Sequence, residues 1–66
     1  MMTTIVKVGE RYQKVSPPHK IYRVVATIKR DAQPAHAQLA AEVDRSQVIT
    51  VAVSALFDYQ FWRPVV

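Results

Sequence analysis

The stretch that decides the fold is Val48–Trp62, which reads VITVAVSALFDYQFW. It begins with a β-branched apolar run and ends with an aromatic run, and a short break at residues 54–58 separates the two. β-Branched and aromatic side chains favour strands over helices. The stretch therefore predicts a strand, a one-turn 3₁₀ connection and a last strand that runs from Tyr59 to Val65.

The side chains of the second half of this stretch divide into a predicted core set and a predicted surface set. We expect Leu56 and Phe61 to be buried, and Tyr59 and Trp62 to be the exposed aromatic residues. Asp58 is expected to accept backbone hydrogen bonds in the turn, because aspartate commonly stabilises turns in this way.

Further towards the N-terminus, Lys20–Arg30 is the clearest long strand. Alternation along it predicts a core face made of Tyr22, Val24, Ala26 and Ile28. The opposite face combines basic and aliphatic side chains, namely Ile21, Arg23, Val25, Thr27 and Lys29. Two shorter extended segments, Thr3–Val8 and Tyr12–Val15, precede it, and Gly9 between them indicates a turn with positive φ.

The segment Ala35–Val43 is ambiguous between helix and strand. Its alanines and Pro34 favour a helix, whereas the alternation of Ala37, Leu39 and Ala41 with more polar residues is typical of a half-buried strand. We favour the strand, because a turn at residues 44–47 would make a hairpin in which Ala37, Leu39 and Ala41 face Ile49, Val51 and Val53. A helix near residues 34–43, in a small α+β domain, is the alternative.

These elements together predict an all-β fold, in which five short strands form a single small domain over residues 1–66. The order of the strands and the lengths of the loops, with a 3₁₀ turn before the last strand, resemble an SH3-like small barrel. A barrel also closes the sheet edges, which is the simplest arrangement at this size. Because that fold carries many unrelated functions, the resemblance implies no functional residues.

Length and composition restrict how this domain can be stabilised. A domain of 66 residues buries only about 60% of its unfolded surface, and without cysteine it has no disulfides. Half of the residues are hydrophobic, so some are expected on the surface, at an interface with a protein partner or a second copy. No stretch approaches the roughly 18 apolar residues of a membrane span, and no signal peptide is visible, so we expect a cytoplasmic protein without membrane contact.

Charge is distributed unevenly along the chain. Residues 1–30 carry seven basic residues and one acidic residue, whereas residues 31–66 carry two basic and four acidic residues. A basic N-terminal half could contact a polyanion such as nucleic acid, although a few excess basic residues also serve solubility.

The sequence does not indicate catalytic chemistry or a cofactor. His19 and His36 lack the spacing of a metal site, and the single glycine excludes glycine-rich phosphate loops. A barrel of this size also offers little concave volume for a small-molecule substrate. We therefore expect neither an enzyme, nor a metal, nor a bound cofactor.

The expected function is that of a non-enzymatic binding module. Protein–protein contact or self-association through an apolar and aromatic face is the first hypothesis, and nucleic-acid binding by the basic N-terminal half is the alternative. The candidate binding surface comprises Arg11, Lys14, Lys20, Arg23, Val25, Lys29, Arg30, Tyr59, Trp62 and Arg63.

Overall fold

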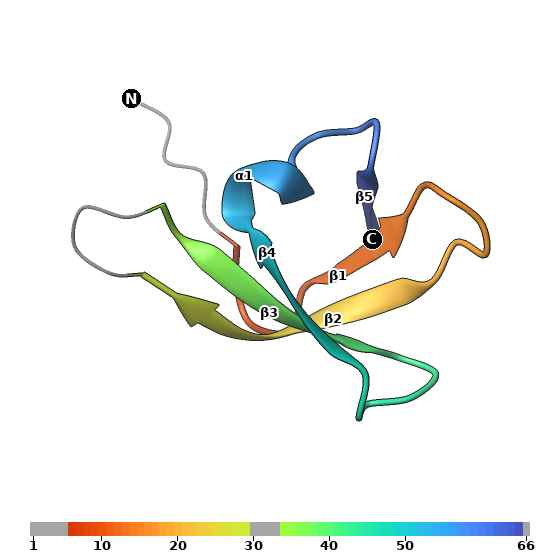
Figure 1. Ribbon diagram of the computed structural model, residues 1–66, viewed down its shortest axis with the longest axis horizontal. Helices are drawn as coiled ribbons and strands as arrows, with labels where there is room; N and C mark the ends of the chain where they lie inside the picture. Colours follow the sequence, from red (N-terminus) through yellow and green to blue (C-terminus); the bar gives the residue numbers. More distant parts are fainter. Residues whose placement is uncertain (1–5, 30–33, 66) are drawn as a thin grey trace.

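Strand β2 (Ile21–Ile28) is the longest strand and lies in the middle of an antiparallel sheet with the order β4-β3-β2-β1-β5. The computed structural model describes residues 6–29 and 34–65. The other elements are β1 (Arg11–Lys14), β3 (His36–Ala41), β4 (Val48–Ala52), the one-turn helix α1 (Val53–Leu56) and β5 (Trp62–Val65). Figure 1 shows the sheet curled into half a barrel, so the predicted all-β class is confirmed.

The ambiguous segment at residues 35–43 forms strand β3, and the helix considered for it is wrong. Leu39 pairs with Ile49, and Ala37 with Val51, as the predicted hairpin requires. The strand is preferred because its alternation buries Ala37, Leu39 and Ala41 completely in the sheet interior. Its turn is closed by Asp44, whose carboxylate accepts hydrogen bonds from the backbone N–H and the hydroxyl of Ser46, at 3.0 and 2.7 Å.

Strand β2 contains an irregularity that alternation does not predict. Tyr22 and Val24 are buried as expected, but the register with β3 shifts between Val24 and Ala26. An extra residue in one strand turns the following side chains to different neighbours. Ala26 and Ile28 are therefore paired with Gln38 and His36 and are only half-buried.

The buried core side chains come from the segment before β1 and from β1, β2, β3, α1 and β5, while β4 contributes partly buried ones. The core members are Val6, Tyr12, Tyr22, Val24, Ala37, Leu39, Ala41, Leu56 and Trp62, with Ile49, Val51 and Val53 packed against them. The predicted burial of Leu56 is confirmed. The ring of Trp62 meets the ring of Tyr22 edge to face, with 5.6 Å between centroids, which is a favourable aromatic geometry.

The predicted burial of Phe61 and exposure of Trp62 are both wrong. Phe61 is 57% exposed, whereas Trp62 is only 4% exposed. The cause is where the last strand begins: β5 starts at Trp62 rather than at Tyr59, and Phe61 belongs to the preceding turn. Because side chains alternate with a period of two, placing the strand an odd number of residues away from its true position exchanges the inward and outward side chains.

The N-terminal segment differs from its prediction as well. Residues 6–8 are not in a strand, although Val6 is buried, and the rest of the predicted strand lies outside the described residues. Gly9 has a φ of +97°, as predicted, and its N–H donates to the carbonyl of Val24 at 2.9 Å. A helical turn does precede the last strand, but it is the α-helical turn α1 in place of the predicted 3₁₀ turn, and it begins one residue earlier than expected.

Within residues 6–29 and 34–65, no helix has the length and apolar character that crossing a membrane requires.

Candidate binding surfaces

Two arginines stand next to each other on the face of the sheet opposite Tyr12 and Tyr22. Arg11 of β1 is paired with Arg23 of β2. The flanking pairs make the backbone hydrogen bonds between these two strands, so Arg11 and Arg23 exchange none with each other. Facing side chains approach most closely at such positions, and like charges there repel each other. A neighbouring anion offsets this repulsion.

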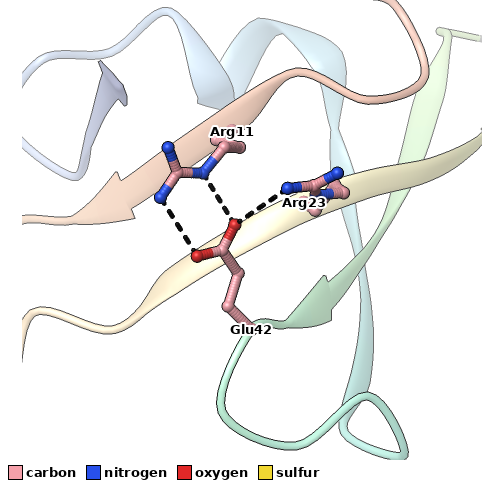
Figure 2. Close-up of polar contacts among 3 residues, drawn as sticks. All are labelled: Arg11, Arg23 and Glu42. Carbon is pink, nitrogen blue, oxygen red and sulfur yellow. Dashed lines mark hydrogen bonds and ion pairs between the residues drawn. The ribbon is translucent and has the colours of Figure 1, made fainter. Parts of the chain in front are cut away.

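Glu42 supplies that anion from the end of β3. Its backbone N–H donates to the carbonyl of Ile21 at 3.0 Å, which holds it beside β2. Figure 2 shows both guanidinium groups directed at its carboxylate. Arg11 donates through Nε at 2.7 Å and through Nη2 at 3.1 Å, whereas Arg23 donates once, at 3.5 Å. Glu42 is thus bound firmly to Arg11 and loosely to Arg23.

The same contacts shift the ionisation of both partners. The hydrogen bonds from Arg11 lower the pKa of Glu42 below its ordinary value, and the charges of Arg11 and Arg23 act in the same direction. Conversely, the hydrogen bond and the charge of Glu42 raise the pKa of Arg11. Glu42 and Arg11 are therefore both charged at neutral pH.

These residues border a groove of about 460 Å³, which we call the arginine groove. It is lined by Arg11, Arg23, Val25, Ala40, Ala41, Glu42 and Arg45. Three arginines and one glutamate thus border the groove, and Val25 and Ala40 supply its aliphatic side chains, because the side chain of Ala41 packs in the core. Arg23 keeps 53% of its side chain exposed, so its remaining N–H groups are accessible from solvent.

A second exposed feature is the turn between α1 and β5, residues 57–61, which we call the aromatic loop. Its aromatic side chains are Phe57, Tyr59 and Phe61, which are 40%, 65% and 57% exposed. The carboxylate of Asp58 accepts the backbone N–H of Gln60 at 3.0 Å, and the Asp58 carbonyl accepts those of residues 61 and 62. The predicted turn role of Asp58 is thereby confirmed.

The aromatic loop is also tied to the neighbouring loop between β1 and β2. The backbone N–H of Val15 donates to the carbonyl of Phe61 at 3.0 Å. A smaller hollow of about 210 Å³ lies beside this contact, lined by Gln13, Lys14, Val15, His19 and Arg63. Two predicted surface cations, Lys14 and Arg63, are thus brought together next to the aromatic loop.

The predicted binding surface is therefore divided between separate places. Arg11, Arg23 and Val25 lie in the arginine groove, Lys14 and Arg63 in the hollow, and Tyr59 in the aromatic loop. Lys20 contacts the side chain of Gln47 at 3.3 Å, Lys29 is exposed at the end of β2, and Arg30 lies outside the described residues.

Trp62 requires a correction, because its burial leaves no ring face for a ligand to stack on. The ring packs in the core and also lies beneath the ammonium group of Lys14, 5.8 Å from the ring centroid. This is the distance of a cation–π contact, so Lys14 covers the tryptophan instead of forming a stacking site with it.

Sequence reasoning did not single out Glu42, Arg45, Phe57 or Phe61 as site residues. Glu42 meets Arg11 across 31 positions of the chain, and no local pattern signals such a contact. The exposure of Phe57 and Phe61 had no such signal either, because the alternation of aromatic residues with Asp58 and Gln60 is typical of a half-buried strand.

Among the residues that the structure describes, no group of three histidine, aspartate or glutamate side chains could hold a metal ion. His36 instead contacts the carbonyl of Pro34 through Nδ1, at 2.9 Å.

The depressed pKa of Glu42 predicts a pH dependence of stability. Because the carboxylate is more acidic in the folded state, its contribution is complete above its ordinary pKa of 4.5 and is lost as the pH falls through the lower folded-state value. We expect Glu42→Gln to be less stable than the wild type at neutral pH and equally stable in acid. Urea unfolding of both proteins at neutral and at acidic pH measures the difference in stability. The pKa of Asp44 is lowered as well, but Asp44 is present in both proteins, so its effect cancels in the comparison. A stability difference that persists in acid would contradict the role of the charge.

Comparison with protein-family models, curated proteins and solved structures gives no match to this chain, so its function is inferred from its own residues.

Proposed function

We propose that this protein is a non-enzymatic module that binds another protein, or a second copy of itself, through the aromatic loop. The observation that carries the proposal is the exposure of three large aromatic side chains within five residues, Phe57, Tyr59 and Phe61. Scattered apolar residues on a surface need no explanation, but concentrated aromatic residues mark contact sites. Tyrosine and other aromatic residues are also enriched at the energetic centres of interfaces.

The hydrogen bonding of the loop supports this proposal. Asp58 accepts three backbone N–H groups, and Phe61 is tied to Val15. A loop that is already ordered loses little conformational entropy on binding, so more of the contact energy appears as affinity.

Nucleic-acid binding is the second candidate, and one observation favours it. The hollow that contains Lys14, His19 and Arg63 adjoins the loop that carries Phe61, so cations and an exposed ring lie close together. Single-stranded nucleic acids are bound by such combinations. It ranks second because Asp58 lies within the aromatic loop and Glu42 neutralises part of the charge of Arg11 and Arg23.

We also propose that the fold is an SH3-like small barrel. This rests on the strand order, in which β1 lies between β2 and β5, and on the single helical turn before β5. The fold alone suggests no partner, since the same architecture serves many functions.

The proposed function is tested with a variant that removes the aromatic side chains, Phe57→Ser/Tyr59→Ser/Phe61→Ser. Sedimentation velocity over a range of concentrations measures self-association, and affinity capture with cross-linking identifies protein partners. We expect a complex that forms with the wild type to weaken at least about tenfold in the variant, because interface aromatic residues contribute most of the binding energy. The complex should also change little with salt.

The matched control is Val8→Ser/Val43→Ser, which removes two exposed apolar side chains outside the aromatic loop, at 64% and 82% exposure. It should retain the complex. If the loop variant also retains every complex, the aromatic loop is not the contact site. If the wild type forms no protein complex and binds oligonucleotides with a steep dependence on salt, the second candidate is correct.

A further inference from the structure

We infer that the arginine groove binds an acidic, extended segment of a partner protein, and that Glu42 is a built-in competitor for the same guanidinium groups. This inference rests on the proposed function in taking the occupant to be a protein, but it concerns different residues from the aromatic loop. The segment would place a carboxylate between Arg23 and Arg45 and a small aliphatic side chain on the floor of the groove.

The charge balance of the groove supports an anionic occupant. Three arginines border it, and Glu42 is the acidic residue among its lining side chains. Arg11 makes two hydrogen bonds to that carboxylate, whereas Arg23 makes one long contact at 3.5 Å. Arginine has five N–H donors in a planar arrangement that matches a carboxylate, so Arg23 retains donors for a second anion.

The floor of the groove favours a peptide over a nucleic acid. Val25 and Ala40 supply its aliphatic side chains, that of Ala41 packs in the core, and none of the residues that line the groove is aromatic. Single-stranded nucleic acid relies on aromatic residues for base stacking, and its closely spaced phosphates would be repelled by Glu42. A peptide can instead place one carboxylate on the arginines and an apolar side chain beside it.

Charge also argues against a second copy of this chain as the occupant. The net charge of +4 favours an acidic occupant of this groove over a second basic copy, whereas self-association through the aromatic loop would rest on apolar contacts. An acidic partner is attracted instead, and its association should accelerate at low ionic strength.

The position of Glu42 makes the inference testable in an unusual direction. An incoming carboxylate has to share the guanidinium groups that Glu42 already contacts. Removing the charge of Glu42 should therefore strengthen ligand binding although it removes a native interaction. A purely structural ion pair would show no such gain.

The experiment uses fluorescence anisotropy with a short labelled peptide in which aspartate and glutamate alternate with valine and alanine. Its counterpart with asparagine and glutamine is the neutral control. At low salt we expect the acidic peptide to bind and the neutral control peptide not to bind. Glu42→Gln should bind it about threefold to tenfold more tightly, and Arg23→Gln/Arg45→Gln about tenfold more weakly.

Matched variants separate the groove from general electrostatic attraction. Glu10→Gln removes one acidic side chain elsewhere on the surface, and Lys7→Gln/Lys29→Gln removes two exposed cations outside the groove. We expect each to change peptide affinity by less than about twofold, as for surface charges that make no direct contact. Circular dichroism of every variant confirms that the fold is retained.

Several results would overturn the inference. One is that the acidic peptide does not bind at low salt, and another is that the arginine and lysine double variants lose the same affinity for it. The others are that Glu42→Gln gains no affinity, or that a single-stranded oligonucleotide binds to the groove in place of the peptide. The aromatic-loop variant should bind the peptide like the wild type. The groove and the aromatic loop can therefore fail independently.

Discussion

Replacing Trp62 with alanine is expected to lower the free energy of unfolding by about 3–5 kcal/mol, whereas Phe61→Ala should lower it by less than about 1 kcal/mol. The two residues are neighbours in sequence and similar in chemistry. They differ in burial, because Trp62 is 4% exposed and Phe61 is 57% exposed.

The large effect of Trp62→Ala has two physical sources. The substitution removes buried aromatic surface and leaves a cavity that the surrounding strands can fill only in part. It also removes the edge-to-face contact with Tyr22 and the contact with Lys14. A domain of fewer than about 70–80 residues rarely has more than about 3–5 kcal/mol of stability, so the variant should be largely unfolded at moderate temperature.

Far-UV circular dichroism during urea titration measures both changes, because Trp62 is the single tryptophan and its fluorescence is lost in the variant. In the wild type, Trp62 emission should be blue-shifted, as expected for a buried indole. If Phe61→Ala proved as destabilising as Trp62→Ala, the order of buried and exposed side chains at the start of β5 would be wrong.

The second large effect is expected for Leu39→Ala, at about 2–5 kcal/mol. Leu39 is fully buried in β3, between Val24 of β2 and Ile49 of β4. The cavity would therefore open in the middle of the sheet, where the backbone hydrogen bonds on both sides of β3 restrict collapse. Ile49→Ala should cost less, because Ile49 is only half-buried.

Val48→Ala is the matched control, since Val48 neighbours Ile49 in the same strand but is 50% exposed. It should change the free energy of unfolding by about 0.5 kcal/mol or less. Thermal and urea unfolding of the three variants should therefore rank them as Leu39→Ala, Ile49→Ala and Val48→Ala, from most to least destabilised. A different order would contradict the assigned core face of the β3–β4 hairpin.

Several features of the fold could be predicted because they depend on local patterns. Alternation within β3 favoured Ala37 and Leu39 as core residues and their pairing with β4, although the same segment also allowed a helix. Gly9 and Asp58 are turn residues whose conformational preferences act within a few positions of the chain. Such signals do not require knowledge of the rest of the molecule.

The candidate surfaces could be predicted only in part. Basic residues of β1 and β2 were identified, but the sequence did not reveal that Arg11 and Arg23 share a carboxylate. That contact depends on the end of β3 reaching β2, where the backbone of Glu42 bonds to Ile21. The aromatic run was recognised as well, but which of its rings are exposed was not.

The sequence by itself thus determined the strand-rich composition, the hairpin of β3 and β4 and the basic character of the N-terminal half. Tertiary structure decided the start of β5, the register shift after Val24 and the arginine groove. The physical reason is the two-residue period of a strand, in which a displacement of a single position exchanges its two faces. Propensity and alternation indicate that a strand is present, but they do not fix the residue at which it begins. Only packing against the neighbouring strands selects that residue.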